Sequence, residues 1–142
     1  PTGFEIDHIT DYRDFLVFSA SRFSGNTAEN ITSSTKVYFW DTGIRNGLIN
    51  NFNALDLRND SGALFENFFI AELLKEKNTN QDRFNSYFWR NHQGKEIDLV
   101  IEENGINKFY ECKLHSKDTK KKIKNMEAKI VTKDNYLEEF KV

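Results

Sequence analysis

Hydrophobic and polar residues follow a clear periodicity only after residue 61. The segment Gly62 to Lys77 has helical length and good helix formers, which predicts an α-helix. Phe84 to Arg90 is rich in aromatic residues and predicts a strand, because aromatic side chains favour the pleated surface of a sheet. Glu96 to Ile101 alternates as a second strand should. The apolar residues expected on one face of this strand are Ile97, Leu99 and Ile101.

A hairpin and two further elements complete the pattern. Asn104-Gly105 is the preferred pair for a two-residue hairpin turn, since both positions need a positive φ, and Lys108 to Leu114 is the expected partner strand. The later segments predict a polar helix, a closing strand and a terminal helix, at Lys117 to Glu127, Lys129 to Lys133 and Asp134 to Val142. The order helix, three strands, helix, strand predicts an α/β fold with a mixed sheet flanked by helices.

The first 60 residues give weaker signals. Phe15 to Phe18 and Val37 to Trp40 predict short strands, Ser24 to Ser34 reads as a loop, and Ile44 to Asn50 predicts a brief helix. We therefore expect residues 1–60 to form a linking segment and a small N-terminal extension, and residues 61–142 to form the core domain.

Composition narrows the class of protein. The 142 residues suit one domain, and 30% charged with 38% hydrophobic residues is a globular balance. A net charge of −2 gives no global attraction to nucleic acid, and the single cysteine, Cys112, cannot form an internal disulfide. No signal peptide or bilayer-spanning stretch is visible, so we expect a cytoplasmic protein without membrane contact. The start at Pro1 without Met leads us to expect a fragment of a longer protein.

Pairing the expected hairpin places two carboxylates together. With Asn104-Gly105 as the turn, Leu99 faces Tyr110 and Asp98 faces Glu111, and directly opposed side chains share a face of the sheet. Two like charges placed this way repel, at a cost approaching about 1 kcal/mol. A divalent cation would turn that repulsion into attraction, and carboxylate oxygens are ligands that Mg²⁺ or Mn²⁺ prefers. The register therefore predicts a metal site at Asp98 and Glu111.

Two more residues join this constellation. Lys113 lies two positions beyond Glu111 and projects from the same face, where its ammonium would position a water or a phosphate. The alternative is an ordinary cross-strand ion pair between Lys113 and Glu96. Glu66 sits on or beside the buried stripe of its helix, so it needs a cation, a donor or a proton. The alternative is a structural partner for Glu66, for which Arg90 and Lys113 are candidates.

These residues resemble a known superfamily. Ile97-Asp98-Leu99-Val100 followed by Glu111-Cys112-Lys113, after a helix, resembles the PD-(D/E)xK restriction-endonuclease-like superfamily, although Ile97 stands where a proline would be. The runs at 36–45, 62–67, 87–90 and 94–98 look more narrowly like the uncharacterised C-terminal domain of predicted AAA-type ATPases.

The resemblance implies a function and a partner. It implies that Asp98, Glu111, Glu66 and the backbone carbonyl of Cys112 hold Mg²⁺ or Mn²⁺, and that Lys113 is the catalytic lysine. It also implies an N-terminal ATPase module as a partner, because members of that family usually carry one. Nothing here matches the phosphate-binding loop G-x-x-x-x-G-K-[ST], so no ATP site is assigned to this chain.

Two functions stay open at this point. The first is a metal-dependent nuclease that hydrolyses a nucleic-acid phosphodiester, with Glu66, Asp98, Glu111 and Lys113 in the site. The second is a non-catalytic interaction or nucleic-acid-tethering domain that retains the nuclease fold. The lysine-rich run between Lys117 and Lys124, with His115, is either a phosphate-contacting surface or a solvated helix face. His8, His92 and His115 lack metal-ligand spacing, which argues against zinc.

Overall fold

A mixed seven-stranded sheet organises the computed structural model, which describes residues 16–23 and 35–140. The strand order is β2-β1-β3-β4-β5-β7-β6, with β1–β3 and β5–β7 parallel and the other neighbours antiparallel. The expected α/β class with a mixed sheet is thereby confirmed. The strands are β1 (Val17–Arg22), β2 (Lys36–Phe39), β3 (Phe84–Arg90), β4 (Glu96–Glu103), β5 (Ile106–Cys112), β6 (Lys120–Ile123) and β7 (Met126–Val131).

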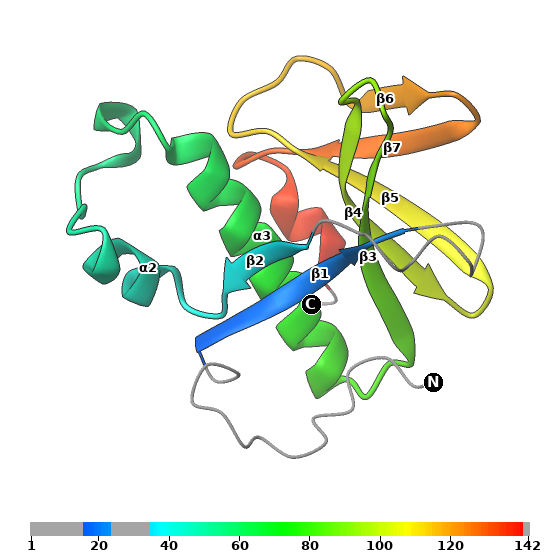
Figure 1. The fold of residues 1–142 in the computed structure, drawn as a ribbon, viewed down its shortest axis with the longest axis horizontal. Coiled ribbons are helices and arrows are strands. Elements are labelled where there is room, and N and C mark those ends of the chain that lie inside the picture. Colours follow the sequence, from blue (N-terminus) through cyan, green and yellow to red (C-terminus); the bar gives the residue numbers. More distant parts are fainter. Residues whose placement is uncertain (1–15, 24–34, 141–142) are drawn as a thin grey trace.

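The helix α3 (Ser61–Thr79) covers one face of the sheet, across which it runs diagonally in Figure 1. Its residues Phe69, Ile70, Leu73 and Leu74 are almost completely buried, and they form the larger core cluster together with side chains of β1 to β5. A smaller cluster, which contains Ile97, Val100, Ile123 and Ala128, forms a second apolar centre. The shorter helical segments are α2 (Thr42–Leu48), η2 (Leu55–Leu57) and η3 (Tyr136–Glu139).

The β4–β5 hairpin has the expected turn and register. Asn104 and Gly105 have φ angles of 53° and 74°, the positive values that a two-residue turn needs. The ladder pairs Glu103 with Ile106 and continues to Leu99 and Tyr110 as expected. The expected register is therefore confirmed up to Leu99, and the ladder ends there, before the expected pair of Asp98 with Glu111.

A β-bulge interrupts β4 at that point. Tyr87 pairs with Val100 and Trp89 pairs with Ile97, so two steps along β3 correspond to three steps along β4. β4 therefore carries one extra residue, in the stretch of Asp98 and Leu99. As a result, Ile97 packs with Val100 in the smaller cluster, while Leu99 packs beneath α3. The expectation that Ile97, Leu99 and Ile101 share one face is wrong for Ile97.

The helix expected at Lys117 to Glu127 is also wrong. This stretch forms β6, a turn in which Lys124 has a φ of 54°, and the start of β7. Pairing of Ile123 with Met126 buries the Ile123 side chain in the smaller cluster, which a solvated polar helix would not do. Helix α3 is therefore followed by strands β3 to β7 without an intervening helix.

The closing elements and the early strands shift by a few residues. The strand expected at Lys129 to Lys133 is β7, which begins and ends earlier, and the terminal helix expected at Asp134 to Val142 is only the short 3₁₀ segment η3. The expected Ser24–Ser34 loop, Phe15 and Val142 lie outside the described residues. Both β1 and β2, which belong to the expected linking segment, extend the same sheet as the later strands.

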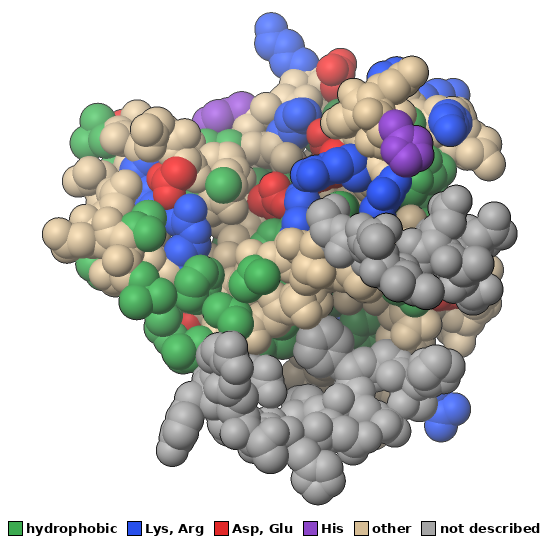
Figure 2. Space-filling model, in the orientation of Figure 1, with side chains coloured by type: hydrophobic (Ala, Val, Ile, Leu, Met, Phe, Trp, Pro, Cys, Tyr) green, Lys and Arg blue, Asp and Glu red, His purple; other side chains and the backbone are tan. Residues whose placement is uncertain are grey.

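Apolar side chains remain exposed around α2. Leu48, Phe52 and Leu57 keep 69%, 71% and 74% of their surface accessible. Figure 2 shows hydrophobic side chains gathered on the side of the molecule where α2 lies. Exposed apolar surface of this kind is typical of interaction sites when it is contiguous.

Candidate functional site

Glu66 lies at the contact between α3 and β2. Its Oε1 accepts a hydrogen bond from Lys36 Nζ at 3.0 Å and another from the Tyr38 hydroxyl at 2.7 Å. The neighbouring Asn67 is buried and binds both backbone groups of Phe39, at 2.9 Å to the N–H and 2.7 Å to the carbonyl. Asn67 thus fastens β2 to α3 and places Lys36 and Tyr38 against Glu66.

Three carboxylates converge here. Glu66 of α3 and Glu96 and Asp98 of β4 each offer an oxygen, and these oxygens all lie within 4.8 Å of one another. We call these three residues the acidic cluster. The bulge in β4 accounts for the position of Asp98, because the extra residue breaks the alternation that would turn its side chain away from α3. The structure therefore brings together Glu66 and Asp98, two of the predicted site residues, and adds Glu96, which the sequence pattern does not single out as a site residue.

The ammonium of Lys36 is shared by the whole acidic cluster. It forms ion pairs with Glu66 at 3.0 Å, with Asp98 at 3.7 Å, and with Glu96. Burial disfavours the charged lysine, but hydrogen bonds and attraction from Glu96 and Glu66 outweigh that cost and raise the pKa of Lys36. Burial likewise disfavours ionised Glu96, yet Lys36 and Arg90 lower its pKa.

The surroundings of Asp98 disfavour the ionised form of its carboxyl group. Burial is the largest cause that raises its pKa, to about 7, and the charges of Glu66 and Glu111 act in the same direction. A hydrogen bond from the Cys112 backbone N–H to Asp98 Oδ2, at 2.8 Å, and the charge of Lys36 oppose this rise only in part. A carboxylate with these surroundings gains from any additional cation.

Glu111 lies outside the acidic cluster, within reach of two other lysines. Its Oε1 pairs with Lys121 at 2.6 Å and with Lys113 at 3.3 Å. The Glu111 side chain is only 7% exposed, and its Oε2 is buried with no hydrogen-bond partner. A buried carboxylate oxygen without a partner is costly, because it has lost its water and gained nothing in exchange. The negative charge of Glu111 also contributes to raising the pKa of Asp98 on the neighbouring strand.

The two remaining predicted residues have different surroundings. Lys113 is 49% exposed and pairs with Glu111, so its ammonium lies beside the carboxylate and open to solvent. Cys112 packs against the larger core cluster, and burial raises the pKa of its thiol well above the usual value. Its backbone N–H is already bound to Asp98.

Several partners differ from those expected from the sequence. Glu66 is bound by Lys36 and Tyr38 rather than by Arg90 or Lys113, and the ion pairs of Glu96 are with Lys36 and Arg90 rather than with Lys113. No local pattern could have found Lys36, which lies 30 residues before Glu66. Lys121 was not distinguishable from Lys120 and Lys122 by sequence either, since its inward position follows from the alternation of side chains in the paired strand β6.

The lysines of β6 alternate between the interior and the surface, because successive side chains of a strand point to opposite faces. Lys121 turns inward, to Glu111 and to the Glu96 backbone carbonyl, whereas Lys120 and Lys122 pair with Glu127 at the surface. The expected solvated helix face is therefore absent from this segment. His92 and His115 are exposed and do not belong to the acidic cluster, and His8 lies outside the described residues.

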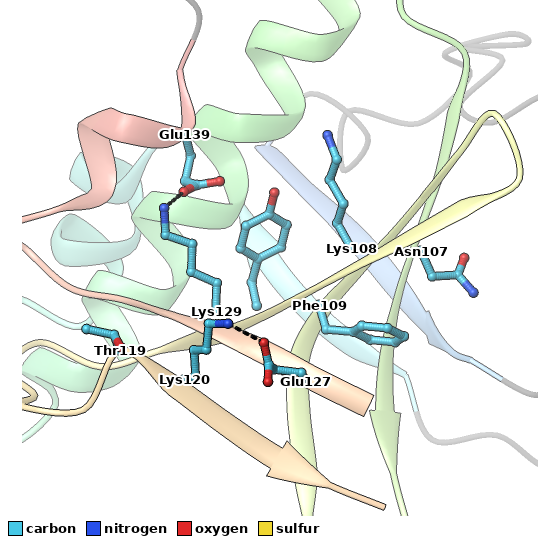
Figure 3. A pocket seen from close by; sticks show the side chains of 9 residues that line it. Asn107, Lys108, Phe109, Thr119, Lys120, Glu127, Lys129 and Glu139 are labelled. Atoms are coloured by element: carbon cyan, nitrogen blue, oxygen red, sulfur yellow. Dashed lines mark hydrogen bonds and ion pairs between the residues drawn. The ribbon is translucent and has the colours of Figure 1, made fainter. Parts of the chain in front are cut away.

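A separate cavity of about 420 Å³ opens where β5 and β7 diverge. The two strands pair only from Tyr110 to Cys112, and the residues before Tyr110 leave a notch beside β6. Figure 3 shows Lys129 paired with Glu139 and Lys120 paired with Glu127 in this notch. None of the residues that line it belongs to the acidic cluster, so this cavity and the candidate chemistry lie apart.

Comparison with known proteins identifies the family. The family described as a domain of unknown function (DUF4143) matches residues 61–139, more than half of the chain. The chain belongs to the DUF4143 family. Glu66, Asp98, Glu111 and Lys113 lie inside the DUF4143 match, and Lys36 lies before it. No curated protein and no solved structure matches the chain.

The helices of the described residues are unsuited to a bilayer. Neither α2 nor α3 combines the length and the apolar character that a membrane crossing needs.

Proposed function

We propose that this DUF4143 chain is a Mg²⁺- or Mn²⁺-dependent phosphodiesterase that acts on nucleic acid, with a restriction-endonuclease-like core. The observation that carries the proposal is the buried, unpartnered Oε2 of Glu111 on the strand beside Asp98. Each carboxylate is desolvated, and the pKa of Asp98 is raised by burial and by its acidic neighbours. A divalent cation held by both residues would relieve both costs.

The residues present fit such an ion by their chemistry. Asp98, Glu111, Glu66 and the backbone carbonyl of Cys112 all offer oxygen, the ligand type that Mg²⁺ and Mn²⁺ prefer. A bound ion would supply Lewis acidity toward a phosphate oxygen and lower the pKa of a bound water. The ammonium of Lys113, exposed and 3.3 Å from Glu111, would hold a phosphate oxygen of the substrate and offset its developing charge.

Calorimetric titration of Mn²⁺ into the purified chain tests the metal site. We expect saturable binding to the wild type and at least about tenfold weaker binding to Asp98→Asn and Glu111→Gln, a loss of about 1.4 kcal/mol or more. Glu72→Gln is the matched control, because Glu72 is an exposed carboxylate of α3 whose ion pair is with Lys75. Absence of binding to the wild type, or equal binding to Asp98→Asn, would contradict the proposal.

A nuclease assay tests the catalytic role of Lys113. We expect Lys113→Ala to keep the wild-type circular dichroism and lose about 100-fold or more of the hydrolysis of single- and double-stranded DNA and RNA, since one charge-stabilising donor contributes about that much. Lys122→Ala, which removes a lysine 78% exposed and paired with Glu127, should leave the rate unchanged. Equal rates for wild type and Lys113→Ala on every substrate would remove the lysine from the mechanism.

A non-catalytic interaction domain is the second candidate. Two observations favour it: Lys36 already supplies a positive charge to the acidic cluster, and the apolar side chains of Leu48, Phe52 and Leu57 are exposed. The partner we propose is the N-terminal ATPase module implied by the resemblance, and nucleic-acid tethering is a variant of the same function. This candidate predicts no saturable Mn²⁺ binding and no hydrolysis by the wild type.

A further inference from the structure

The acidic cluster contains a cation that belongs to the chain itself. Lys36 Nζ lies 3.0 Å from Glu66 Oε1 and 3.7 Å from Asp98 Oδ1, and it is hydrogen-bonded to Glu96. These are carboxylates whose oxygens lie close enough together to share one ion. The ammonium of Lys36 thus lies among the three carboxylates and forms an ion pair with each of them.

We propose that Lys36 is a resident counter-cation that a divalent metal ion must displace from Glu66 and Asp98, so that Lys36 sets the metal affinity of the site. This inference rests on the metal site proposed above and concerns a residue outside that ligand set. The competition follows from shared ligands: Glu66 and Asp98 are assigned to the ion, and both are ion-paired with Lys36. Two cations cannot both take full advantage of the same oxygens.

Lys36 is better suited to this role than the other lysines nearby. Its side chain is 20% exposed, against 32% for Lys121 and 49% for Lys113. Its ammonium lies 5.5 Å from the centre of the Phe88 ring, which limits its contact with water on that side. Lys36 also begins β2, two residues before Tyr38, whose hydroxyl binds Glu66. Asn67 holds the same strand to α3 through the backbone of Phe39. The ammonium is therefore held by the fold.

Glu111 differs from Glu66 and Asp98 in that one of its oxygens has no cationic partner. The Oε2 atom of Glu111 is buried and lacks a partner, so it is available to an ion without breaking any bond. An ion that reached this oxygen would displace no lysine from it, whereas it would have to draw Asp98 and Glu66 away from Lys36. Lys36 lies before the DUF4143 match, whereas the proposed ligands lie inside it. The competitor is thus supplied by the N-terminal strands of the sheet.

The test is calorimetric titration of Mn²⁺ into the full chain and its variants. Lys36→Met removes the charge and keeps most of the apolar stem, and we expect it to bind Mn²⁺ at least about tenfold more tightly than the wild type. Lys36→Arg keeps the charge and should bind like the wild type. Lys108→Met is the charge-matched control, because Lys108 lies near the start of β5 and pairs with Glu103 of β4. The affinity of this variant for Mn²⁺ should stay within about twofold of the wild type.

Each outcome is decisive. Equal affinity of wild type and Lys36→Met, with binding still lost in Asp98→Asn, would overturn the role of Lys36 and leave the metal site standing. Equal tightening by Lys36→Met and Lys108→Met would also overturn it, because the effect would then be one of net charge. Failure of every variant to bind Mn²⁺ would overturn the metal site and the competition together.

A second variant covers poor folding of Lys36→Met. Lys36→Gln keeps a side-chain donor for the carboxylates but no charge, and it should show the same tightening. The thermal midpoint supplies a readout apart from calorimetry: without metal the variant should unfold at a lower temperature than the wild type, and saturating Mn²⁺ should raise its midpoint more. A smaller Mn²⁺-induced rise in both variants than in the wild type would contradict the inference.

Discussion

The acidic cluster beneath α3 and Glu111 on the neighbouring strand β5 balance their charges in different ways. In the cluster, one partly buried ammonium, that of Lys36, is shared by the carboxylates of Glu66, Glu96 and Asp98. Glu111 instead relies on Lys113 and Lys121, whose side chains are 49% and 32% exposed, and one of its oxygens has no partner. In the first region each carboxylate has a cationic partner, although burial and neighbouring charges still raise the pKa of Asp98. In the second region one carboxylate oxygen has no partner.

The difference shows where an added cation would act. A buried network that is complete resists change, whereas a buried oxygen without a partner stabilises whatever binds it. Asp98 connects the two regions, because its pKa is raised by burial and then by Glu66 on one side and Glu111 on the other. Variants that act on only one region should therefore separate the two kinds of compensation.

The largest effect is expected from Asp98→Asn in the metal-free protein. Since the folded pKa of Asp98, about 7, exceeds the ordinary value of 3.8, the stability from its protonated form is complete below about pH 4 and is lost as pH rises through 7. Asparagine does not titrate, and its oxygen can still accept from the Cys112 N–H. Asp98→Asn should thus gain stability over the wild type at pH 8, up to about 4 kcal/mol, with little gain at pH 4.

Urea unfolding of both proteins between pH 4 and pH 8 measures that gain. Glu127→Gln is a control at a surface carboxylate whose pKa is lowered by a hydrogen bond from Lys120, and it should not gain stability with rising pH. A difference between Asp98→Asn and wild type that stays constant with pH would show that the charge of Asp98 is already compensated within the cluster.

Asn67→Ala should act on the α3 region alone. The variant leaves the N–H and carbonyl of Phe39 without their partner on α3, at a cost of about 3 kcal/mol. It also frees β2, which carries Lys36 and Tyr38. Hydrogen exchange should show faster exchange in β2 and unchanged protection in β6 and β7. Equal loss of protection in both regions would mean that the acidic cluster and Glu111 are not independent.

Much of this arrangement could be read from the sequence, and the rest depended on tertiary contacts. The turn at Asn104-Gly105 and the hairpin register followed from local rules. The bulge at Asp98 and Leu99 did not, because it arises from pairing with β3. Lys36 reaches Glu66 only through the pairing of β2 with β1 and its attachment to α3, so no spacing in the sequence reveals it.

The error at β6 has a similar cause. Its four residues, Lys120 to Ile123, have little intrinsic strand preference, and a run of lysines is equally compatible with a polar helix. What makes them a strand is pairing with β7 and burial of Ile123 in the smaller core cluster. Placement of Lys121 beside Glu111 is a consequence of that pairing, so the basic partner was missed together with the strand.

Lys121→Met should affect the Glu111 region with an intermediate cost. It removes the donor 2.6 Å from Glu111 and leaves a buried carboxylate paired only with the exposed Lys113. Breaking a buried pair typically costs 3–5 kcal/mol, but Lys121 is one-third exposed, so we expect about 2 kcal/mol. Chemical denaturation measures this loss. The neighbouring Lys122→Met should change stability by less than about 0.5 kcal/mol.

Lys121→Met also sharpens the comparison through metal binding. Because the variant frees Glu111 Oε1, Mn²⁺ should restore part of the lost stability, whereas it should restore none in Asn67→Ala beyond the rise seen for the wild type. If Mn²⁺ gives Lys121→Met no more stabilisation than wild type, Glu111 is not a ligand.

Tyr38→Phe is expected to have the smallest effect, about 1 kcal/mol, and it tests how complete the compensation of the acidic cluster is. The Tyr38 hydroxyl donates to Glu66 Oε1 at 2.7 Å, and burial followed by the charge of Glu66 raises its pKa above the ordinary range. Removing the hydroxyl leaves Glu66 bound by Lys36, so the carboxylate keeps a partner and the loss is that of one hydrogen bond. Thermal unfolding of Tyr38→Phe beside Tyr136→Phe, an aromatic control packed on α3, measures it. A loss as large as that of Asn67→Ala would mean that Lys36 alone does not satisfy Glu66, and that the cluster is as incompletely satisfied as Glu111.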